Sequence, residues 1–356
     1  MPPRSFPALG APFLKPVLIA PVLFVLAIGI PFADEEKAPP GSAVAKIRSD
    51  AEELQPLVKT AWVKDFLKET VRLPPIQPRK LFFNEAKTRY YTAEEAEKLS
   101  EALQFGVISK EFDEDFYYNT RYGTPLAYAR PLDLLGEVGF EPRGRKILDF
   151  GYGGIGQLRL LASIGADVVG VEVDPLSRAL YSWPQDQGTI KGLNGTQGTL
   201  HLVNGRFPAE EAVSLDVGVG YDLVISKNVL KRGYIHPEKP VPDKQRVILG
   251  VDDETYVKTL YAILKPGGRV LIYNLSPAQN PPDKPYIPWA DGRSPFPTAL
   301  WKSAGFRVIE FDRDDSAMAR KMAHALGWDE GEQPMSLEKD LFAHYTLVEK
   351  PKGKKS

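Results

Sequence analysis

Along residues 41–73 apolar residues recur at intervals of three and four, which is the period of an amphipathic helix. The proline-rich stretch 74–78 interrupts this pattern. A second helix is predicted to begin at Thr92, because Thr92 and Glu95 have the spacing of a capping box. No motif that carries chemistry stands out here, so residues 34–119 are predicted to form a helical N-terminal extension with a packing role.

After residue 119 strand-like and helix-like segments alternate. KILDF (146–150) and DVVGVEV (167–173) are short apolar runs typical of buried strands, and an apolar-striped helix ended by Gly165 lies between them. Further strand-like runs follow at 199–205, 221–229, 269–275, 307–313 and 341–350, with a helix-like stripe at 253–264. Strands that alternate with helices pair in parallel. Residues 120–350 are therefore predicted to form an α/β domain with a doubly wound sheet, followed by a short basic tail at 351–356.

The first 33 residues have a different composition. Arg4 and Lys15 precede an uncharged apolar run, Pro16–Ala33, and acidic sequence follows. This order is typical of a secretory signal peptide cleaved after Ala33. The 18 residues of the run are also near the shortest length that spans a bilayer, so an uncleaved anchor, with membrane association through residues 13–33, is the alternative. Either reading predicts that the remaining chain is exported, because the positive charges precede the run; a non-functional signal would leave it cytoplasmic.

The amino-acid composition limits which partners and which catalytic groups can be expected. The formal net charge of −1 gives no reason to expect a nucleic-acid partner. The chain has no cysteine, which excludes disulfides, thiol catalysis and cysteine-ligated metals. Its four histidines are widely spaced, so no metal site is expected.

The segment ILDFGYGGIG (147–156) is the strongest candidate for a ligand-binding loop. Gly151 and Gly153 allow a sharp turn and a close approach of backbone N–H groups to a ligand, and the helix that follows points its free donors at the same space. Glu172 ends the next predicted strand, about 20 residues further on, where an acid can accept the hydroxyls of a ribose. The glycines alone fit a dinucleotide as well as they fit other nucleotide-like cofactors.

Taken together, ILDFGYGGIG, VVGVEVDP, YDLVISKNVL and LKPGGRVLIYNL resemble class I S-adenosylmethionine-dependent methyltransferases, over roughly residues 124–350. The resemblance implies a Rossmann-like sheet of seven strands with the last one antiparallel. Asp149 lies two residues before the first glycine, where the acid of this family holds the methionine amino group. A dinucleotide site usually has an apolar residue there, so an NAD-dependent oxidoreductase is the less favoured alternative.

The resemblance also implies roles for single residues towards S-adenosylmethionine. Asp149 would bind the amino-acid end, Gly151 and Gly153 would make room for the cofactor, Glu172 would bind the ribose and Val173 would lie beside the adenine. After the third strand many members of the family have an acid that meets the adenine amine. This chain has Asn204 there, followed by Gly and Arg, so Asn204 takes that role or the contact is missing.

Two stretches are candidates for the acceptor side, residues 116–135 and 227–240. An oxygen or nitrogen acceptor can need a base, and His236 is the best candidate because the pKa of an imidazole is near neutrality. Further catalytic candidates are Asn228 and Tyr122, and candidates for contact with the acceptor are Tyr118, Arg121, Arg232 and Tyr234. The opposing interpretation is that the charged loop is solvated and that the tyrosines pack in the core. The long proline-rich segment 274–297 is predicted to form a lid.

These patterns predict an exported methyltransferase that acts on a small-molecule or envelope-associated acceptor. One conflict remains, because S-adenosylmethionine is made in the cytoplasm whereas the N-terminus indicates export. The alternative is a non-catalytic protein that keeps the fold as a binding module. Arg206, in place of the usual acid, favours this alternative slightly, and Asp149 and Glu172 oppose it.

Overall fold

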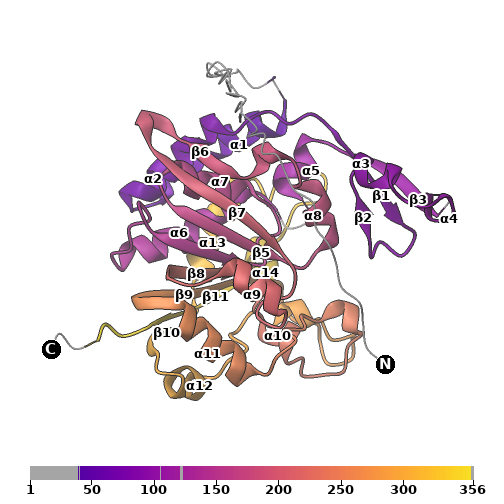
Figure 1. Cartoon of the computed structure of the whole chain (residues 1–356). Helices are drawn as coiled ribbons and strands as arrows, with labels where there is room; N and C mark the ends of the chain where they lie inside the picture. Colours follow the sequence, from indigo (N-terminus) through magenta and orange to yellow (C-terminus); the bar gives the residue numbers. More distant parts are fainter. Residues whose placement is uncertain (1–38, 40, 105, 121–122, 354–356) are drawn as a thin grey trace, which may run out of the picture. The chain divides into compact units, whose positions relative to one another are not determined.

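The computed structural model describes residue 39 and residues 41–104, 106–120 and 123–353 (Figure 1). Residues 1–33, with the predicted signal peptide or anchor, lie outside the described residues, as do Arg121 and Tyr122. Within the described ranges no helix is both long and apolar enough to cross a membrane.

A mixed sheet of eight strands organises the described chain, in the order β10-β11-β9-β8-β4-β5-β7-β6. Its strands are β4 (Lys146–Phe150), β5 (Asp167–Glu172), β6 (Gly188–Lys191), β7 (Gln197–Asn204), β8 (Tyr221–Lys227), β9 (Leu264–Ser276), β10 (Arg307–Asp314) and β11 (Phe342–Glu349). Strands β7, β5, β4, β8 and β9 pair in parallel, whereas β11 runs antiparallel to both β9 and β10. The predicted doubly wound α/β sheet with an antiparallel last strand is therefore confirmed.

The predicted count of seven strands is wrong by one. The additional strand, β6, pairs antiparallel with β7 at the edge of the sheet. It has only four residues, of which Ile190 alone is buried, so it carries almost no hydrophobic periodicity. A strand this short and this exposed leaves no clear pattern in a single sequence.

Alternation along the central strands divides the core into two layers. In β4, Ile147 packs in one apolar cluster and Leu148 in another, as expected when successive side chains point to opposite faces. The first cluster is covered by α1 (Ala43–Leu54), α2 (Ala61–Lys68), α6 (Ala129–Glu137), α7 (Gly156–Ser163), α8 (Pro175–Leu180) and α13 (Ser316–Ala325). The second is covered by α9 (Glu211–Val217), α11 (Asp253–Ile263) and α12 (Thr298–Ser303).

The prediction of a wholly helical extension is wrong for residues 79–112. Helices α1 and α2 are followed by a three-stranded antiparallel sheet in the order β2-β1-β3. Its strands are β1 (Arg79–Asn84), β2 (Tyr90–Tyr91) and β3 (Val107–Phe112), and the short helices α3 (Ala93–Glu97) and α4 (Glu101–Gln104) lie between β2 and β3. Buried and less buried side chains alternate along β1, the pattern of a strand with one covered face. The predicted capping box at Thr92 and Glu95 is confirmed, and it opens α3.

The extension packs on the sheet domain rather than standing apart from it, since residues 35–356 form one compact unit. Helix α2 contacts α6 and α7, and α1 contacts α5 (Glu114–Asn119). The Trp62 indole N–H donates to the backbone carbonyl of Phe140 at 2.9 Å. Arg79 of β1 forms a buried ion pair with Asp186, with N–O distances of 2.6 and 2.8 Å.

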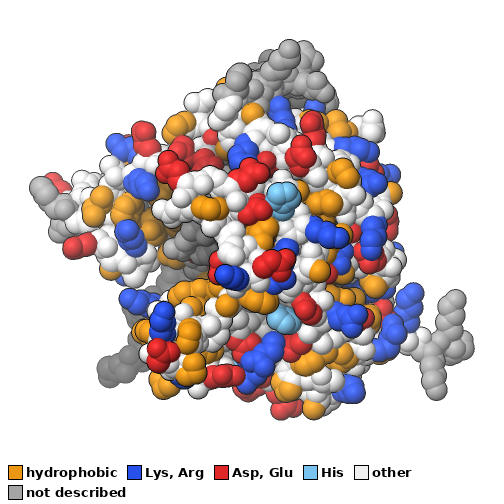
Figure 2. Space-filling view, turned by 180° about the vertical axis from the view of Figure 1, so that it is seen from behind, with side chains coloured by type: hydrophobic (Ala, Val, Ile, Leu, Met, Phe, Trp, Pro, Cys, Tyr) orange, Lys and Arg blue, Asp and Glu red, His pale blue; other side chains and the backbone are white. Residues whose placement is uncertain are grey.

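On the face opposite to that of Figure 1, acidic and basic side chains are interspersed (Figure 2). No broad basic area is visible among the described residues of this face. The view agrees with the near-zero net charge of the chain.

Candidate functional site

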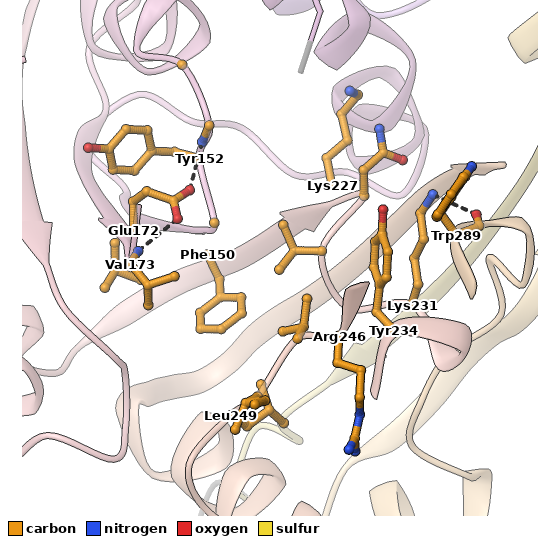
Figure 3. A pocket seen from close by; sticks show the side chains of 18 of the residues that line it. Phe150, Tyr152, Glu172, Val173, Lys227, Lys231, Tyr234, Arg246, Leu249 and Trp289 are labelled. Carbon is orange, nitrogen blue, oxygen red and sulfur yellow. Dashed lines mark hydrogen bonds between the residues drawn. The ribbon is translucent and has the colours of Figure 1, made fainter. Parts of the chain in front are cut away.

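A cavity of about 690 Å³ lies at the carboxyl ends of the parallel strands (Figure 3). The ends of β4, β5, β8 and β9 line it, together with the loop that follows β7. From β4 the chain moves outward in one direction through β5 and β7, and in the other through β8 and β9. The cavity therefore lies where the strand order reverses, which is the usual ligand position in an open α/β sheet. Its volume is in the ordinary range for small-molecule sites.

The glycine loop forms a tight turn at the edge of this cavity. Gly151 and Gly153 have φ angles of +74° and +62°, which residues with a Cβ rarely adopt. A Cβ at position 151 would lie 2.5 Å from the Cγ2 atom of Val229. Both the backbone and the packing therefore require glycine at Gly151, and the loop leaves open the space in front of α7.

Glu172 lies at the end of β5 and lines the same cavity. Its carboxylate accepts hydrogen bonds from the backbone N–H groups of Gly153 at 3.2 Å, Val173 at 2.8 Å and Asp174 at 3.1 Å. Burial raises the pKa of Glu172, while these three donors act in the opposite direction. Val173 is 59% exposed beside it and also lines the cavity. The structure thus brings Gly151, Gly153, Glu172 and Val173 together, as predicted.

Asp149 lies deeper than expected. Its side chain is fully buried and does not line the cavity. It accepts hydrogen bonds from the Tyr128 hydroxyl at 3.1 Å and from Gln157 Nε2 at 3.3 Å, and both of these side chains do line the cavity. Burial raises the pKa of Asp149 to about 7. The direct contact between Asp149 and a ligand stays a prediction; in this structure the carboxylate is bonded to two side chains that themselves line the cavity, because the turn before α6 places Tyr128 beside it.

Lys227 is the last residue of β8 and the first of the stretch 227–240 that the sequence marks as a candidate for the acceptor side, where it received no individual role. It is only 8% exposed and lines the cavity, with its ammonium 5.4 Å from the centre of the Tyr128 ring. Burial lowers its pKa to about 8. The available signal was a lysine at the end of an otherwise apolar strand. Asn228 follows with a φ of +65°, and its Oδ1 accepts a hydrogen bond from the N–H of Leu275 at 2.7 Å.

The proline-rich segment 274–297 forms one wall of the cavity through Leu275, Pro277 and Trp289. The ammonium of Lys231 holds this wall by donating to the backbone carbonyls of Leu275 and Trp289. Burial lowers the pKa of Lys231 to about 7. Tyr234 lines the cavity on the same side, as the sequence predicts (Figure 3).

The loop after β7 differs from the prediction. Asn204 is exposed and is not part of the cavity lining, whereas Gly205 and Arg206 are. The predicted contact between Asn204 and the adenine is therefore not supported, because the strand ends with this side chain outside the cavity. Lys244 and Arg246 add two more basic groups to the lining, and Glu172 is the one acid among its described residues.

Three predicted acceptor-side residues lie elsewhere. His236 is 46% exposed at its side chain and pairs with Asp253 of α11 at 2.8 Å, outside the cavity lining. Arg232 lies 3.6 Å from Glu238 and 3.9 Å from Asp291. Tyr118 is buried, and its hydroxyl donates to the carbonyl of Pro74 at 2.6 Å. The prediction that these residues line an acceptor pocket is corrected, because each finds a partner in the surrounding protein.

No protein-family model matches the chain, and no curated protein matches it either. Among solved structures it is similar to the [4+2]-cyclase SpnF, with 16% identity and a TM-score of 0.37 over 63% of this chain and 81% of that one. A putative sarcosine dimethylglycine methyltransferase from Galdieria sulphuraria shares 14% identity at a TM-score of 0.35, over 64% and 85% of the two chains. A third similar structure is phosphoethanolamine N-methyltransferase 2 of Haemonchus contortus, in complex with phosphomonomethylethanolamine and S-adenosylhomocysteine. Its sequence identity is 15% and its TM-score is 0.37, over 69% of this chain and 63% of that one. At such low values these similarities assign no residue, substrate or reaction to this chain.

The strand order defines the fold class directly. If β6 is set aside and the other seven strands are numbered along the chain, the sheet reads 6-7-5-4-1-2-3, with the seventh strand antiparallel to its neighbours. The glycine turn follows the first of these strands, and Glu172 ends the second. This is a Rossmann-like fold, with the antiparallel last strand that the resemblance to class I S-adenosylmethionine-dependent methyltransferases implies.

Proposed function

We propose that this chain binds S-adenosylmethionine and transfers its methyl group to a small-molecule acceptor. One observation carries the proposal: the glycine turn and the carboxylate of Glu172 lie together at the edge of one cavity, at the point where the strand order reverses. A nucleoside ligand needs both features, since its ribose offers two hydroxyls and its bulk requires a backbone without side chains.

The lining residues fit the cofactor in three parts. Glu172 retains acceptor capacity for ribose hydroxyls, and Val173 and Phe207 offer apolar surface to a base. Tyr128 and Gln157, both hydrogen-bonded to Asp149, offer polar atoms to the amino-acid portion. The fit is incomplete at one point, because Arg206 rather than an acid follows β7 and offers no acceptor to an adenine amine.

When bound, S-adenosylmethionine supplies an electrophilic methyl group on a sulfonium. The residues of this chain then hold the acceptor in line with that methyl, and positioning of this kind can supply much of a rate enhancement. Tyr234, Leu275 and Trp289 form the wall where an acceptor would lie. No histidine lies in the described lining, and the titratable side chains of this wall are those of Tyr234 and Lys231.

Isothermal titration calorimetry tests the proposal with S-adenosylmethionine, S-adenosylhomocysteine and NAD as ligands. We expect binding of the first two and none of the third. In Glu172→Gln we expect the affinity for S-adenosylhomocysteine to fall by about tenfold or more, because a charge-assisted hydrogen bond is lost. Glu238→Gln changes an exposed carboxylate outside the cavity lining and should leave the affinity unaltered. Absence of binding by the folded wild-type protein would remove the proposal.

A binding module without catalysis is the second candidate, and the basic, histidine-free lining favours it. Turnover distinguishes the two candidates, because only a methyltransferase converts S-adenosylmethionine to S-adenosylhomocysteine. Mass spectrometry would detect S-adenosylhomocysteine formed from S-adenosylmethionine in the presence of small anionic and neutral acceptors. Tight cofactor binding with no product across such acceptors would support the binding module.

A further inference from the structure

The ammonium of Lys227 is a buried cation that faces the cavity without an acceptor. Within the described ranges its ammonium makes no hydrogen bond; it lies 5.4 Å from the centre of the Tyr128 ring, and the Asp149 carboxylate acts on it only as a nearby charge. The neighbouring Lys231 differs, because its ammonium donates to two backbone carbonyls. A buried charge that lacks a hydrogen-bonding partner is costly. An anionic group on a ligand would remove this cost at Lys227.

The groups next to Lys227 offer hydrogen-bond acceptors, whereas Lys227 offers only donors. Strands β4 and β8 are adjacent, with Asp149 in register with Ile225, two residues before Lys227. The Tyr128 hydroxyl uses its proton on Asp149, so only its lone pairs remain for a ligand. Gln157 Nε2 donates to Asp149 and to the Tyr152 carbonyl, which leaves the Gln157 amide oxygen as an acceptor. This corner of the cavity thus has two sides. Tyr128 and Gln157 can accept hydrogen bonds from a cation, and Lys227 can donate hydrogen bonds to an anion.

An α-amino acid is the chemical group that matches such a corner, because it carries an ammonium and a carboxylate on one carbon. We propose that Lys227 binds the α-carboxylate of the cofactor's methionine portion, while Tyr128 and Gln157 accept hydrogen bonds from its α-ammonium. Asp149 is then a positioning residue that orients both acceptors. The inference rests on the proposed function, since it assigns part of the same cofactor site.

The pairing between Lys227 and the α-carboxylate can be tested from both sides. One change removes the carboxylate from the ligand, and the other removes the ammonium from the protein. The ligands are S-adenosylhomocysteine and its decarboxylated analogue, and calorimetry measures both on the wild-type protein and on Lys227→Met. Methionine keeps the length of the side chain and removes a buried charge, so the variant should fold. Circular dichroism checks the fold, and Lys227→Gln is the second variant should Lys227→Met fail that check.

We expect Lys227→Met to weaken binding of S-adenosylhomocysteine by about tenfold or more, in line with the loss of a charge-assisted hydrogen bond. The same variant should bind the decarboxylated analogue within about twofold of the wild-type affinity. Lys239→Met is the control, because Lys239 is an exposed lysine outside the cavity lining. It should leave both affinities unchanged.

The outcomes separate the inference from the proposed function. If the wild-type protein binds neither ligand, the proposed function fails and the inference fails with it. If the wild-type protein binds S-adenosylhomocysteine, the proposed function stands. The inference is then overturned if Lys227→Met retains that affinity, or if it weakens both ligands equally.

Discussion

At Gly151 two independent constraints exclude a side chain. The φ angle of +74° is unfavourable for an L-residue, and a Cβ would meet Val229 at 2.5 Å. We expect Gly151→Ala to lower the free energy of unfolding by about 1–3 kcal/mol and to abolish detectable binding of S-adenosylhomocysteine. Chemical denaturation and calorimetry measure the two effects.

Gly195 provides the control for this substitution. Its φ angle is +75°, but a Cβ there would meet no atom within 4 Å. Gly195→Ala should therefore lower the free energy of unfolding only by the cost of a positive φ angle, about 1–2 kcal/mol, and leave binding intact. Equal loss of binding in both variants would mean that the effect of Gly151→Ala is general destabilisation.

The affinity for S-adenosylhomocysteine should depend on pH through Asp149 and Lys227. The pKa of Asp149 is raised to about 7 by burial, so the carboxylate that orients Tyr128 and Gln157 forms as the pH rises through 7. The pKa of Lys227 is lowered to about 8, so the ammonium is lost as the pH rises through 8. Affinity should rise as the pH passes about 7 and fall as the pH passes about 8, with a narrow maximum between the two limbs.

Calorimetry between about pH 6 and about pH 9 checks this profile. Lys227→Met should lose the alkaline limb, and Asp149→Asn should lose the acid limb. The control ligand is 5′-methylthioadenosine, which lacks the amino-acid portion and should bind with little dependence on pH. A profile of S-adenosylhomocysteine equally flat in the wild-type protein would contradict the assignment of both groups.

Sequence reasoning identified the residues whose roles depend on local spacing. Gly151, Gly153 and Glu172 lie where their distances along the chain place them, because a strand, a tight turn and the next parallel strand fix their geometry. Sequence reasoning included Lys227 only as part of the stretch 227–240 and gave it no role of its own, and it misplaced His236. These outcomes depend on tertiary contacts: a tyrosine from a distant turn beside Lys227, and an aspartate of α11 that holds His236.

At the scale of elements, a buried ion pair between Arg79 and Asp186 joins the small sheet of the extension to the main domain. Asp186 is fully buried and accepts hydrogen bonds from Arg79, from the Tyr117 hydroxyl at 2.8 Å and from the Trp183 N–H at 2.9 Å. Loss of Arg79 would leave this carboxylate buried without its cation. We expect Arg79→Met to lower the free energy of unfolding by about 3–5 kcal/mol, measured by urea denaturation.

Lys98→Met is the control for this prediction, because it breaks an exposed ion pair between Lys98 and Glu94 at 2.6 Å. Such pairs contribute about 1 kcal/mol or less. A cost for Arg79→Met as small as that for Lys98→Met would mean that Asp186 is satisfied by its remaining donors. The affinity for S-adenosylhomocysteine should be unchanged in both variants, since neither residue lines the cavity.

The elements that the sequence predicted well are the long, regular ones. Strands β4 and β8 are buried along almost their whole length and have apolar centres, and α11 has a clear apolar face. The strands β1 and β3 were missed because they follow helices in a segment that is mostly exposed, where β3 has only Phe112 buried. Strand β3 therefore offers little buried face for period-based reasoning, whereas in β1 the buried face includes Arg79, and Phe82 lies on the other side, so the sequence itself does not alternate.

At the scale of the whole molecule, the extension and the sheet domain share one core. Val63, Phe66 and Leu67 of α2 belong to the same apolar cluster as Ile147 of β4 and Leu161 of α7. The sequence predicted an extension with a packing role and a boundary at residue 120, where composition and periodicity change, but neither property reports which surfaces pack together. The sequence pattern therefore changes near residue 120, but the apolar core continues across this position.

A shared core predicts that the sheet domain does not fold alone. A fragment of residues 113–353 exposes the apolar faces of α6 and α7 that α2 covers in the complete protein. We expect this fragment to lack a cooperative urea transition, whereas residues 39–353 should unfold in a single transition with a slope that reflects their full buried surface. Far-UV circular dichroism and tryptophan fluorescence, which reports on Trp62 in the extension and Trp301 in the opposite core layer, should coincide in the longer fragment. A cooperative transition in residues 113–353 would mean that the extension is an accessory layer, and that the cofactor site can form without it.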